Sequence, residues 1–506
     1  MDPETWLSPL FDAAAMRETD RWAIEDRGVP SLRLMETAGG AVAEAVEAVA
    51  GSGPVRVVCG KGNNGGDGLV AARALAEYGT EVEVMLLWDA AELSPDSSAN
   101  FERYAGEVRR PEPDEIGGLL AGSGAIVDAI FGTGFAGVAR DPAAAAIEAI
   151  NEAGCPVVAC DIASGVDAAT GAAPGAAVRA TRTVTFHAAK LGHLIEPGRS
   201  LTGELIVAAI GIPAGAPVLP AGGMIRESIL DDLPRREDRS NKFSSGNVLV
   251  VGGSRGLTGA VCMAAQAAIR AGAGYAAVAA PAELEPILEA KLTEVMTLAV
   301  AGSGGSLEPQ AGGPILARSE SADCVVLGPG LGRAPYAAEL ARELVAAIRV
   351  PLLVDADGLN ALGTDLEAAA VPGRPLVLTP HAGELARLLG VDSGAVYAAR
   401  LDSAREAARR CGGIVVLKGT DTIVTDGERV AINALASPGL ATAGTGDVLS
   451  GAIAALVARG VEPFRACAVG VLAHARAGRL AAERIGTVES VIATDVIGAL
   501  PAGLAR

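Results

Sequence analysis

A glycine-rich segment in the N-terminal half combines groups that could hold an anion with groups that could move protons. It reads Gly60-Lys61-Gly62-Asn63-Asn64-Gly65-Gly66-Asp67-Gly68 and lies between an apolar run and an alanine-rich stretch. Glycines at a turn that opens a helix let backbone N–H groups approach an anion closely, and the helix dipole favours negative charge there. The pattern G-x-G-x-x-G is present, but its carboxamides and carboxylate are unusual for a plain hydride-transfer enzyme. A tight turn capped by Asx side chains is the structural alternative.

Two further carboxylates follow apolar runs in the same half. Asp128 precedes a Gly-Thr-Gly turn, and Asp161 precedes Ser164. Carboxylates at the ends of successive strands, beside Asn64 and a hydroxyl, suit a hard cation with oxygen ligands or a site of proton transfer. Either Asp alone could instead cap the turn that follows it. The two together favour a site.

The C-terminal half holds a second glycine-rich bend, Gly444-Thr445-Gly446-Asp447, ahead of an apolar stretch typical of a helix. The first amides of a helix lack intrahelical partners and could bind phosphoryl oxygens. The carboxylate beside them could take the proton of a substrate hydroxyl that attacks phosphorus. No G-x-x-x-x-G-K-[ST] motif occurs, which excludes a P-loop. A glycine-rich turn with an acidic first helical turn is the alternative.

A third pattern resembles a hydrolase only superficially. The run Gly252-Gly253-Ser254-Arg255-Gly256 matches G-x-S-x-G, and Asp355 and His381 follow in the order of an α/β-hydrolase triad. In a nucleophile elbow the helix starts directly at the serine. Here the loop continues, and Thr258 is placed to cap a helix that begins near Ala260. We therefore interpret the match as coincidental.

The elements that must position these groups alternate between β-branched runs and alanine-rich stretches, which predicts parallel α/β sheets. Strands are predicted at 55–60, 81–87, 125–132, 156–161 and 183–186, and then at 247–253, 275–281, 324–330, 351–357, 375–380 and 414–419. Helices are predicted at Ala13–Asp26, Leu32–Ala50, Leu69–Tyr78 and Ala143–Ala153. Ligands bind such sheets at the carboxyl ends of the strands, so both halves are expected to carry a site.

Length and composition narrow the function classes. The 506 residues allow two large domains or about three smaller ones. A net charge of −19 and an aromatic content of 3% disfavour nucleic acid and anionic membranes as partners. Seven dispersed cysteines without a C-x-x-C motif, and an acidic N-terminus without a secretion signal, indicate reduced thiols and a cytoplasmic location. The uncharged stretch 205–225 contains three prolines, so we interpret its second half as a linker rather than a membrane span.

The N-terminal half resembles the epimerase domain of the NAD(P)H-hydrate repair enzymes over residues 10–213. The likeness rests on the glycine-rich segment and on LMETAG (34–39), DAIFGTG (128–134), DIASGVDAATG (161–171) and TVTFHAAKLG (183–192). It implies a Rossmann-like three-layer αβα fold, a potassium ion held by Asn64, Asp128 and Ser164, and Asp161 as the catalytic contact near the epimerised carbon. The residues implied to bind the hydrated dinucleotide are Asn63, Asn64, Gly65, Gly66, Asp67, Gly132, Thr133, Gly134, Phe135, Ala136, Gly137 and Val138. Thr37 and Ala163 depart from the family pattern, which has Asn and Pro there.

The C-terminal half resembles the ADP-dependent NAD(P)H-hydrate dehydratases, which have a ribokinase-like αβα fold, over Met224 to Arg506. The likeness rests on GPGLG (328–332), DADGLNAL (355–362), TPHAGE (379–384), LKGTDTIV (417–424) and ASPGLATAGTGDVLSG (436–451). It implies Asp447 as the base, magnesium with the nucleotide, and contacts from Ala260, Gly332 and His381 to the hydrated cofactor. The residues implied to bind ADP are Lys418, Gly419, Thr420, Asp421, Thr422, Ser437, Gly439, Leu440, Ala441, Thr442, Ala443, Gly444, Thr445 and Gly446. The segment Ser240-Asn241-Lys242-Phe243 departs from the His-Lys-Gly common in the family.

Together the likenesses predict an epimerase domain at 1–213, a linker at 214–223 and a dehydratase domain at 224–506. Such a chain would repair NADHX and NADPHX, the hydrates of NADH and NADPH, with ADP as co-substrate, and we expect a homo-oligomer. The rival hypothesis is a vitamin-precursor kinase of the same fold, fused to a non-catalytic dinucleotide-binding module. Lys190 is either a solvated loop cation or a partner of the substrate's phosphate, and His187, His193 and His474 are expected in surface or packing roles.

Overall fold

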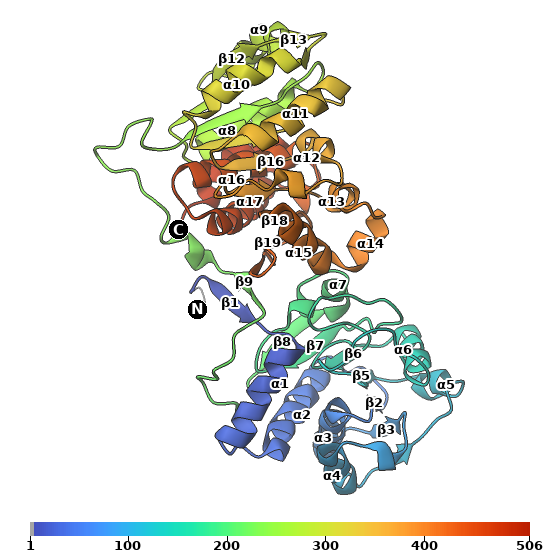
Figure 1. The fold of residues 1–506 in the computed structure, drawn as a ribbon. Coiled ribbons are helices and arrows are strands. Elements are labelled where there is room, and N and C mark those ends of the chain that lie inside the picture. The colour runs from blue at the N-terminus through green and yellow to red at the C-terminus, as the bar shows by residue number, and fades with distance from the viewer. Residues whose placement is uncertain (1–4) are drawn as a thin grey trace. The chain divides into compact units, whose positions relative to one another are not determined.

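The computed structural model describes residues 5–506 and divides into two compact units (Figure 1). Unit 1 comprises residues 9–223. Unit 2 comprises residues 224–506 together with residues 5–8 near the N-terminus.

Unit 1 is built on a seven-stranded sheet whose printed strand pairs are all parallel. In spatial order its strands are β4 (Val108–Arg109), β3 (Val82–Leu86), β2 (Val55–Cys59), β5 (Ala125–Ala129), β6 (Val157–Cys160), β7 (Arg182–Phe186) and β8 (Glu204–Ala208). The chain runs outward from β2 in one direction through β3 and in the other through β5. Doubly wound sheets bind ligands in the crevice beyond the carboxyl ends of the strands at such a switch point.

Helices cover both faces of this sheet, which gives three layers. They are α1 (Ala13–Arg21), extended by a π-helical turn at Trp22–Asp26, α2 (Ser31–Glu47), α3 (Asn63–Glu77), α4 (Pro95–Arg103), α5 (Ile116–Leu120), α6 (Ala143–Glu152) and α7 (Gly198–Thr202). One apolar core joins α2 and α3 to the sheet, and a second core joins α5 and α6 to the opposite face. The fold predicted for this half is therefore confirmed.

The helix predicted to begin at Leu69 begins six residues earlier, at Asn63. The glycine-rich segment is thus the first turn and a half of α3 rather than a loop. A side-chain carbon at Gly65 would overlap the backbone of Gly60, and one at Gly66 would contact Met35 and Ser97. The glycines let this end of the helix pack against its own entry loop and against α2, which the prediction underestimated by treating glycine only as a helix breaker.

Unit 2 contains an eleven-stranded sheet. In spatial order its strands are β1 (Leu7–Leu10), β9 (Gly222–Ile225), β20 (Val430–Ile432), β19 (Ile423–Thr425), β18 (Ile414–Leu417), β17 (Leu376–Leu378), β16 (Leu352–Val354), β15 (Cys324–Leu327), β10 (Asn247–Val251), β11 (Tyr275–Pro281) and β12 (Met296–Val300). The strands from β12 to β18 are parallel, whereas β18, β19 and β20 pair antiparallel. A small hairpin, β13 (Gly302–Ser303) and β14 (Ser306–Leu307), lies outside this sheet.

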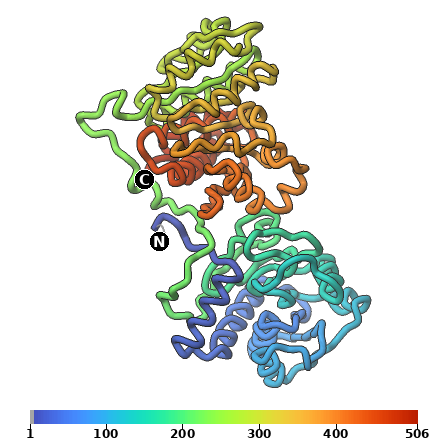
Figure 2. The backbone as a smooth tube through the Cα atoms, viewed as in Figure 1, coloured from blue at the N-terminus to red at the C-terminus, as the bar shows by residue number. Residues whose placement is uncertain are grey.

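The helices of unit 2 are α8 (Thr258–Arg270), α9 (Glu285–Lys291), α10 (Gly312–Ser319), α11 (Pro335–Ala347), α12 (Asp357–Leu362), α13 (Ala382–Leu389), α14 (Ser393–Ala398), α15 (Arg400–Cys411), α16 (Thr445–Ala458), α17 (Pro463–Ile485) and α18 (Ala493–Gly503). The last three pack with α8 over one face of the sheet in a single large apolar core (Figure 2). Within residues 5–506, no helix is both long and apolar enough to cross a membrane.

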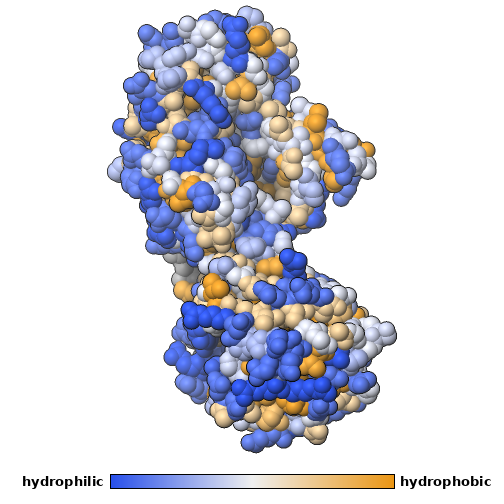
Figure 3. Space-filling view, turned by 90° about the vertical axis from the view of Figure 1, so that its right-hand side faces the viewer, coloured by the Kyte–Doolittle hydropathy of each residue, from blue (hydrophilic) through white to orange (hydrophobic). Residues whose placement is uncertain are grey.

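Two local expectations are wrong in unit 2. Thr258 is the first residue of α8 rather than its cap, and its hydroxyl accepts a hydrogen bond from Lys291 Nζ at 2.9 Å. The strands predicted to run to 330 and 357 end at Leu327 and Val354, because the glycines and acidic residues that follow form the site loops. The face drawn in Figure 3 is predominantly hydrophilic on each unit, with strongly apolar residues scattered among polar ones, as the net charge of −19 leads one to expect.

Two candidate active sites

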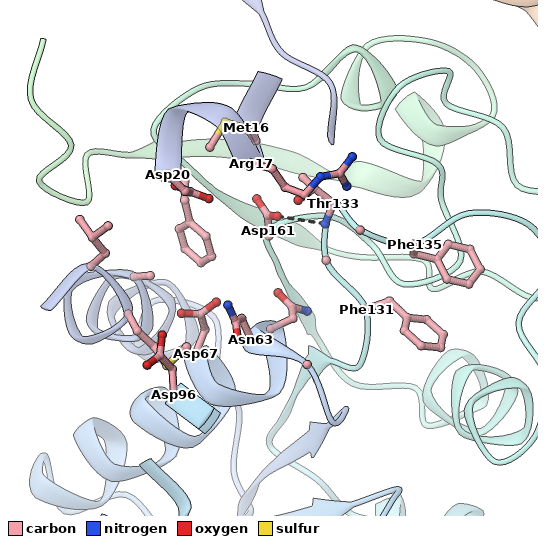
Figure 4. A pocket seen from close by; sticks show the side chains of 18 of the residues that line it. Met16, Arg17, Asp20, Asn63, Asp67, Asp96, Phe131, Thr133, Phe135 and Asp161 are labelled. Atoms are coloured by element: carbon pink, nitrogen blue, oxygen red, sulfur yellow. Dashed lines mark hydrogen bonds between the residues drawn. The ribbon is translucent and has the colours of Figure 1, made fainter. Parts of the chain in front are cut away.

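Unit 1 contains a cavity of about 620 Å³ at the switch point of its sheet (Figure 4). The entry to α3 and the loop after β5 form its walls. The predicted residues that line it are Asn63, Asn64, Asp67, Gly132, Thr133, Gly134, Phe135, Ala136 and Asp161. Gly65, Gly66, Gly137 and Val138 are not among the lining residues. Residues that the sequence did not single out also contribute, above all Met16, Arg17 and Asp20 of α1, beside Trp88 and Lys61.

Asp161 is the most constrained carboxylate of this cavity. It has a positive φ of 66°, which few residues other than glycine adopt. Its Oδ1 accepts hydrogen bonds from Lys190 Nζ at 2.7 Å and from Thr185 Oγ1 at 3.1 Å, and its Oδ2 accepts one from the Thr133 amide at 3.2 Å. Burial alone would raise the pKa of Asp161, but the Lys190 ammonium and its hydrogen bond more than offset this and hold the pKa below the ordinary value. Asp161 is therefore an ionised carboxylate.

Lys190 occupies neither of the two positions considered from the sequence. Its side chain is completely buried, and besides Asp161 it donates to Thr185 Oγ1 at 2.7 Å and to the Phe186 carbonyl at 3.1 Å. A buried ammonium is tolerated only when paired and hydrogen-bonded, and both conditions hold here. The lysine thus fixes the charge and the orientation of the catalytic aspartate.

His193 holds the backbone at the same place. Its Nδ1 accepts a hydrogen bond from the Lys190 amide at 3.0 Å, and its Nε2 lies 3.0 Å from the Asp161 carbonyl. This pairing requires the neutral ring with the proton on Nε2. Burial, assisted by the Lys190 charge, lowers the pKa of His193 to about 4, so the ring stays neutral at physiological pH. The expected packing role is found, and it supports the positive φ of Asp161.

The other carboxyl groups of the cavity behave in the opposite way to Asp161. Burial first, and then the charges of Asp161 and Asp20, raise the pKa of Asp67 well above the ordinary value. Burial and the charge of Asp161 raise the pKa of Asp20 to about 6. Figure 4 shows Asp20 and Asp67 directed into the space that Asp161 faces. The cavity therefore combines an ionised carboxylate with carboxyl groups that retain a proton, the arrangement from which general acid–base pairs are made.

The three residues expected to hold potassium offer suitable donors. Asp128 is fully buried; its Oδ1 accepts a hydrogen bond from Ser164 Oγ at 2.6 Å, and its Oδ2 accepts one from the Ser164 amide at 2.8 Å. Burial raises the pKa of Asp128 to about 6. Asn64 is buried, and neither its Oδ1 nor its Nδ2 has a hydrogen-bond partner among the described residues. Because an orphaned buried amide is costly, the oxygen-rich set fits a cation that Asn64 would help to ligate.

Unit 2 contains a second cavity, of about 520 Å³. The predicted residues that line it are Lys418, Gly419, Thr420, Thr422, Ser437, Leu440, Ala441, Thr445 and Gly446. Gly439, Thr442, Ala443 and Gly444 belong to the same segment but are not among the lining residues. Asp421 lies outside the lining as well. It is 1% exposed and pairs with the buried guanidinium of Arg400, so its carboxylate anchors the loop from behind.

The start of α16 is prepared for an anion. Gly444 has a φ of 93° at the N-cap position, and no side chain caps the first amides of the helix. Lys418 Nζ lies next to this turn, since a side-chain carbon at Gly446 would be 3.3 Å from it. Burial lowers the pKa of Lys418, but Asp355, whose Oδ1 is 3.1 Å away, and Glu384 at 3.7 Å more than offset this, so the pKa is raised overall. A charged lysine beside free amides is a site for phosphoryl oxygens.

Asp447 follows directly in the first turn of α16. Burial and then the charge of Asp355 raise its pKa to about 7, although Lys418 acts in the opposite direction. Asp355 is held in place by Lys418 and by Ser450 Oγ, which donates to its Oδ2 at 2.6 Å. A carboxyl group with this pKa is half ionised near neutral pH and can both take and return a proton there.

The remaining predicted residues lie around this cavity rather than in its lining. His381 caps α13, since its Nδ1 accepts hydrogen bonds from the amides of Gly383 and Glu384 at 3.0 and 3.3 Å. The Gly332 amide donates to Asp357 Oδ2 at 3.0 Å, and Ala260 lies in the first turn of α8. Because Nδ1 of His381 is used by amides and Asp355 by Lys418, no Asp–His pair of a hydrolase triad forms.

Comparisons with known proteins decide between the hypotheses. A family model described as NAD(P)H-hydrate dehydratase matches residues 248–502, and one described as YjeF-related protein N-terminus matches residues 31–192. The "Bifunctional NAD(P)H-hydrate repair enzyme Nnr" of Moorella thermoacetica is 42% identical over 515 residues, which covers 97% of this chain and 96% of the relative. The protein of the same name from Salinibacter ruber is 38% identical over 530 residues, with 99% and 97% covered. This chain belongs to the bifunctional NAD(P)H-hydrate repair enzymes.

The resemblance inferred from the sequence is thereby confirmed for both halves. Among solved structures, the ADP/ATP-dependent NAD(P)H-hydrate dehydratase of Bacillus subtilis, co-crystallised with ATP/Mg²⁺, is 26% identical with a TM-score of 0.47, covering 55% of this chain and 95% of that one. As in other bifunctional NAD(P)H-hydrate repair enzymes, both family regions are present in one chain. Residues 31–192 include the lysine, the histidine and the aspartates of the first site, except Asp20. Residues 248–502 include the whole lining of the second cavity.

Proposed function

We propose that unit 1 interconverts the R and S hydrates of NADH and NADPH, and that unit 2 dehydrates the S hydrate at the expense of ADP, giving NAD(P)H, AMP and phosphate. The observation that carries this proposal is Asp447, a carboxyl group of pKa about 7 beside a charged lysine and the uncapped start of α16. This set is suited to moving a proton and a phosphoryl group at neutral pH.

In unit 2, Asp447 would accept the proton of the hydroxyl on C6 of the hydrate as that oxygen attacks the terminal phosphorus of ADP. The new O–P bond forms while the bond to the leaving AMP breaks, and Lys418 and the first amides of α16 stabilise the phosphoryl oxygens. Phosphate is a far better leaving group than hydroxide. Loss of phosphate from C6 and of a proton from C5 then restores the C5–C6 double bond.

In unit 1, epimerisation requires that the hydroxyl leave C6 and that water return on the other face. The ring nitrogen supplies the electron pair that expels the hydroxyl, so positive charge develops on the ring. The ionised Asp161 would stabilise this charge and then take a proton from the returning water. Asp67, whose raised pKa keeps a proton on it, would protonate the departing hydroxyl.

The metal ions that we propose have separate roles. Asn64, Asp128 and Ser164 would hold potassium in unit 1, where the cation offsets negative charge on the bound dinucleotide. Magnesium would enter unit 2 with the nucleotide, because Mg²⁺ commonly takes one or two protein carboxylates and completes its shell with phosphate oxygens and water. Within residues 5–506, no group of three or more His, Cys, Asp or Glu side chains is arranged to hold a metal by itself. We further propose a cytoplasmic, homo-oligomeric enzyme.

Purified enzyme incubated with mixed hydrates tests the proposal. With ADP, absorbance of reduced nicotinamide should return to completion, because unit 1 feeds the R hydrate to unit 2. Chromatography should show AMP and inorganic phosphate in amounts equal to the NAD(P)H formed. A stable phosphoester with no recovery of absorbance would instead identify a kinase. Recovery that stops when the S hydrate is used up would show unit 1 to be non-catalytic.

A further inference from the structure

One histidine in the wall of the unit 2 cavity has an unused nitrogen. His474 of α17 lines the cavity and is 7% exposed. Its Nε2 is buried and has no hydrogen-bond partner among the described residues. The mechanism proposed above does not use this residue, and its alanine-rich surroundings in the sequence indicated only a packing role. An unpartnered buried nitrogen that faces a cavity points to a ligand.

The state of the ring defines what it can offer. Burial lowers the pKa of His474 to about 4, so the ring is neutral and carries one N–H and one lone pair. A backbone hydrogen bond with Thr445 favours the protonated ring, which is the effect of a carbonyl that accepts the N–H. With Nε2 unpartnered, Nδ1 is the donor in this bond. Nε2 then presents its lone pair to the cavity as an acceptor.

Neighbouring polar side chains are already satisfied within the protein. Thr422 Oγ1 donates to the Gly419 carbonyl at 2.8 Å, and Thr445 Oγ1 donates to the Leu440 carbonyl at 2.8 Å. The Asn433 amide exchanges hydrogen bonds with the backbone of Leu435. The Nε2 lone pair therefore stands out against groups that do not need a ligand.

The surroundings of this nitrogen are apolar. The apolar side chains that line the cavity with it are Leu435, Leu440, Leu449 and Val471. Such walls suit a flat heterocycle, which gains by leaving water, and a single acceptor selects heterocycles that carry a donor. Lys418 and Gly446 line the same cavity, so a nucleotide whose phosphates lie there can place its base against α17.

We propose that His474 Nε2 accepts a hydrogen bond from the exocyclic amino group of the adenine base, and that this contact makes unit 2 select 6-amino over 6-oxo purine nucleotides. The inference rests on the proposed function, since it takes this cavity to be the ADP site. A 6-oxo purine such as hypoxanthine presents an oxygen where adenine presents an amine. Two acceptors would then face each other in a buried place, and the buried lone pair would lose its partner.

The test compares ADP with inosine diphosphate as co-substrate for dehydration of the S hydrate. In the wild-type enzyme we expect kcat/KM to be at least about tenfold higher with ADP, the effect of one buried hydrogen bond and one repulsion. His474→Leu should reduce kcat/KM with ADP and bring the ratio close to one. His474→Gln should recover ADP use through its amide oxygen and also accept inosine diphosphate through its amide nitrogen. Glu483→Gln, on the exposed surface of the same helix, is the matched control and should keep the wild-type ratio.

The outcomes separate this inference from the proposed function. Absence of ADP-dependent dehydration in the wild-type enzyme would overturn the proposed function and the inference with it. Normal dehydration together with an ADP preference that persists in His474→Leu would overturn the inference alone. Equal losses with both nucleotides would assign the residue to packing, and a defect seen only with deoxyribose analogues would assign it to the sugar. Epimerisation by unit 1 and the thermal midpoint report whether each variant is folded.

Discussion

The raised pKa of Asp447 makes the dehydration step depend on pH in the physiological range. A general base must be ionised, and a carboxyl group of pKa about 7 goes from about one-tenth ionised at pH 6 to about nine-tenths at pH 8. We therefore expect kcat/KM for dehydration to rise about tenfold from pH 6 to pH 8 and to level off above. An aspartate at its ordinary pKa of 3.8 would be fully ionised throughout this range and would give a flat profile.

The titration of ADP itself falls in a similar range, so the profile needs a variant that moves only the base. Asp355 contributes more to the raised pKa of Asp447 than any other charge, whereas Asp357 contributes the least of the causes identified. Asp355→Asn removes a neighbouring negative charge and should shift the inflection to lower pH. Asp357→Asn is the matched control and should shift it less. The assay is recovery of reduced nicotinamide from the S hydrate at saturating magnesium across pH 5–9.

Two results would refute this reasoning. An inflection that stays in place in Asp355→Asn would assign the titration to the nucleotide or to another group. A shift to higher pH would mean that Asp355 acts chiefly by holding Lys418, whose positive charge lowers the pKa of Asp447, rather than by its own negative charge.

Four further changes test the rest of the assignment. Asp161→Asn should lower epimerisation by about 100-fold or more and leave dehydration of the S hydrate intact, measured with separated R and S hydrates. Lys190→Met should raise the pKa of Asp161, so that epimerisation is weak at neutral pH and recovers as the pH is raised; an unchanged pH profile would contradict the ion pair. Asn64→Ala should abolish stimulation of epimerisation by potassium while sodium remains ineffective, as followed by titration with each chloride salt. Asp421→Asn should lower the free energy of unfolding of unit 2 by about 3–5 kcal/mol in denaturant titrations, because it leaves the Arg400 guanidinium buried and unpaired.

The strand ends could be predicted because their signal is local. Apolar β-branched runs mark the parallel strands, and an acidic residue directly after such a run lies at the carboxyl edge of the sheet. Asp128 and Asp161 were placed in this way, and β5 and β6 are indeed neighbours in the sheet. The antiparallel strands β19 and β20 were not predicted, since three-residue strands beside glycines and aspartates do not differ in pattern from turns.

Partners that are distant in sequence could not be predicted. Lys190 lies 29 residues from Asp161, and Arg400 lies 21 residues from Asp421, and only the folded chain brings each pair together. Assigning Asp421 to the nucleotide followed from its position in a motif, whereas its contacts are those of a buried ion pair. His474 shows the same limit in reverse, because a histidine among alanines has no feature that distinguishes packing from an unpartnered nitrogen at a cavity.

The two sites use a similar set of groups with opposite electrostatic results. In unit 1 the buried ammonium of Lys190 contacts the catalytic aspartate directly and keeps it ionised. In unit 2 the corresponding ammonium, Lys418, is hydrogen-bonded to Asp355, and the reactive Asp447 experiences that second carboxylate as a net source of negative charge. A permanently ionised group suits a step in which positive charge develops on a ring. A group of pKa near 7 suits a step in which a hydroxyl proton must be taken and later released. The position of one lysine relative to two aspartates therefore decides which of the two chemistries each unit supports.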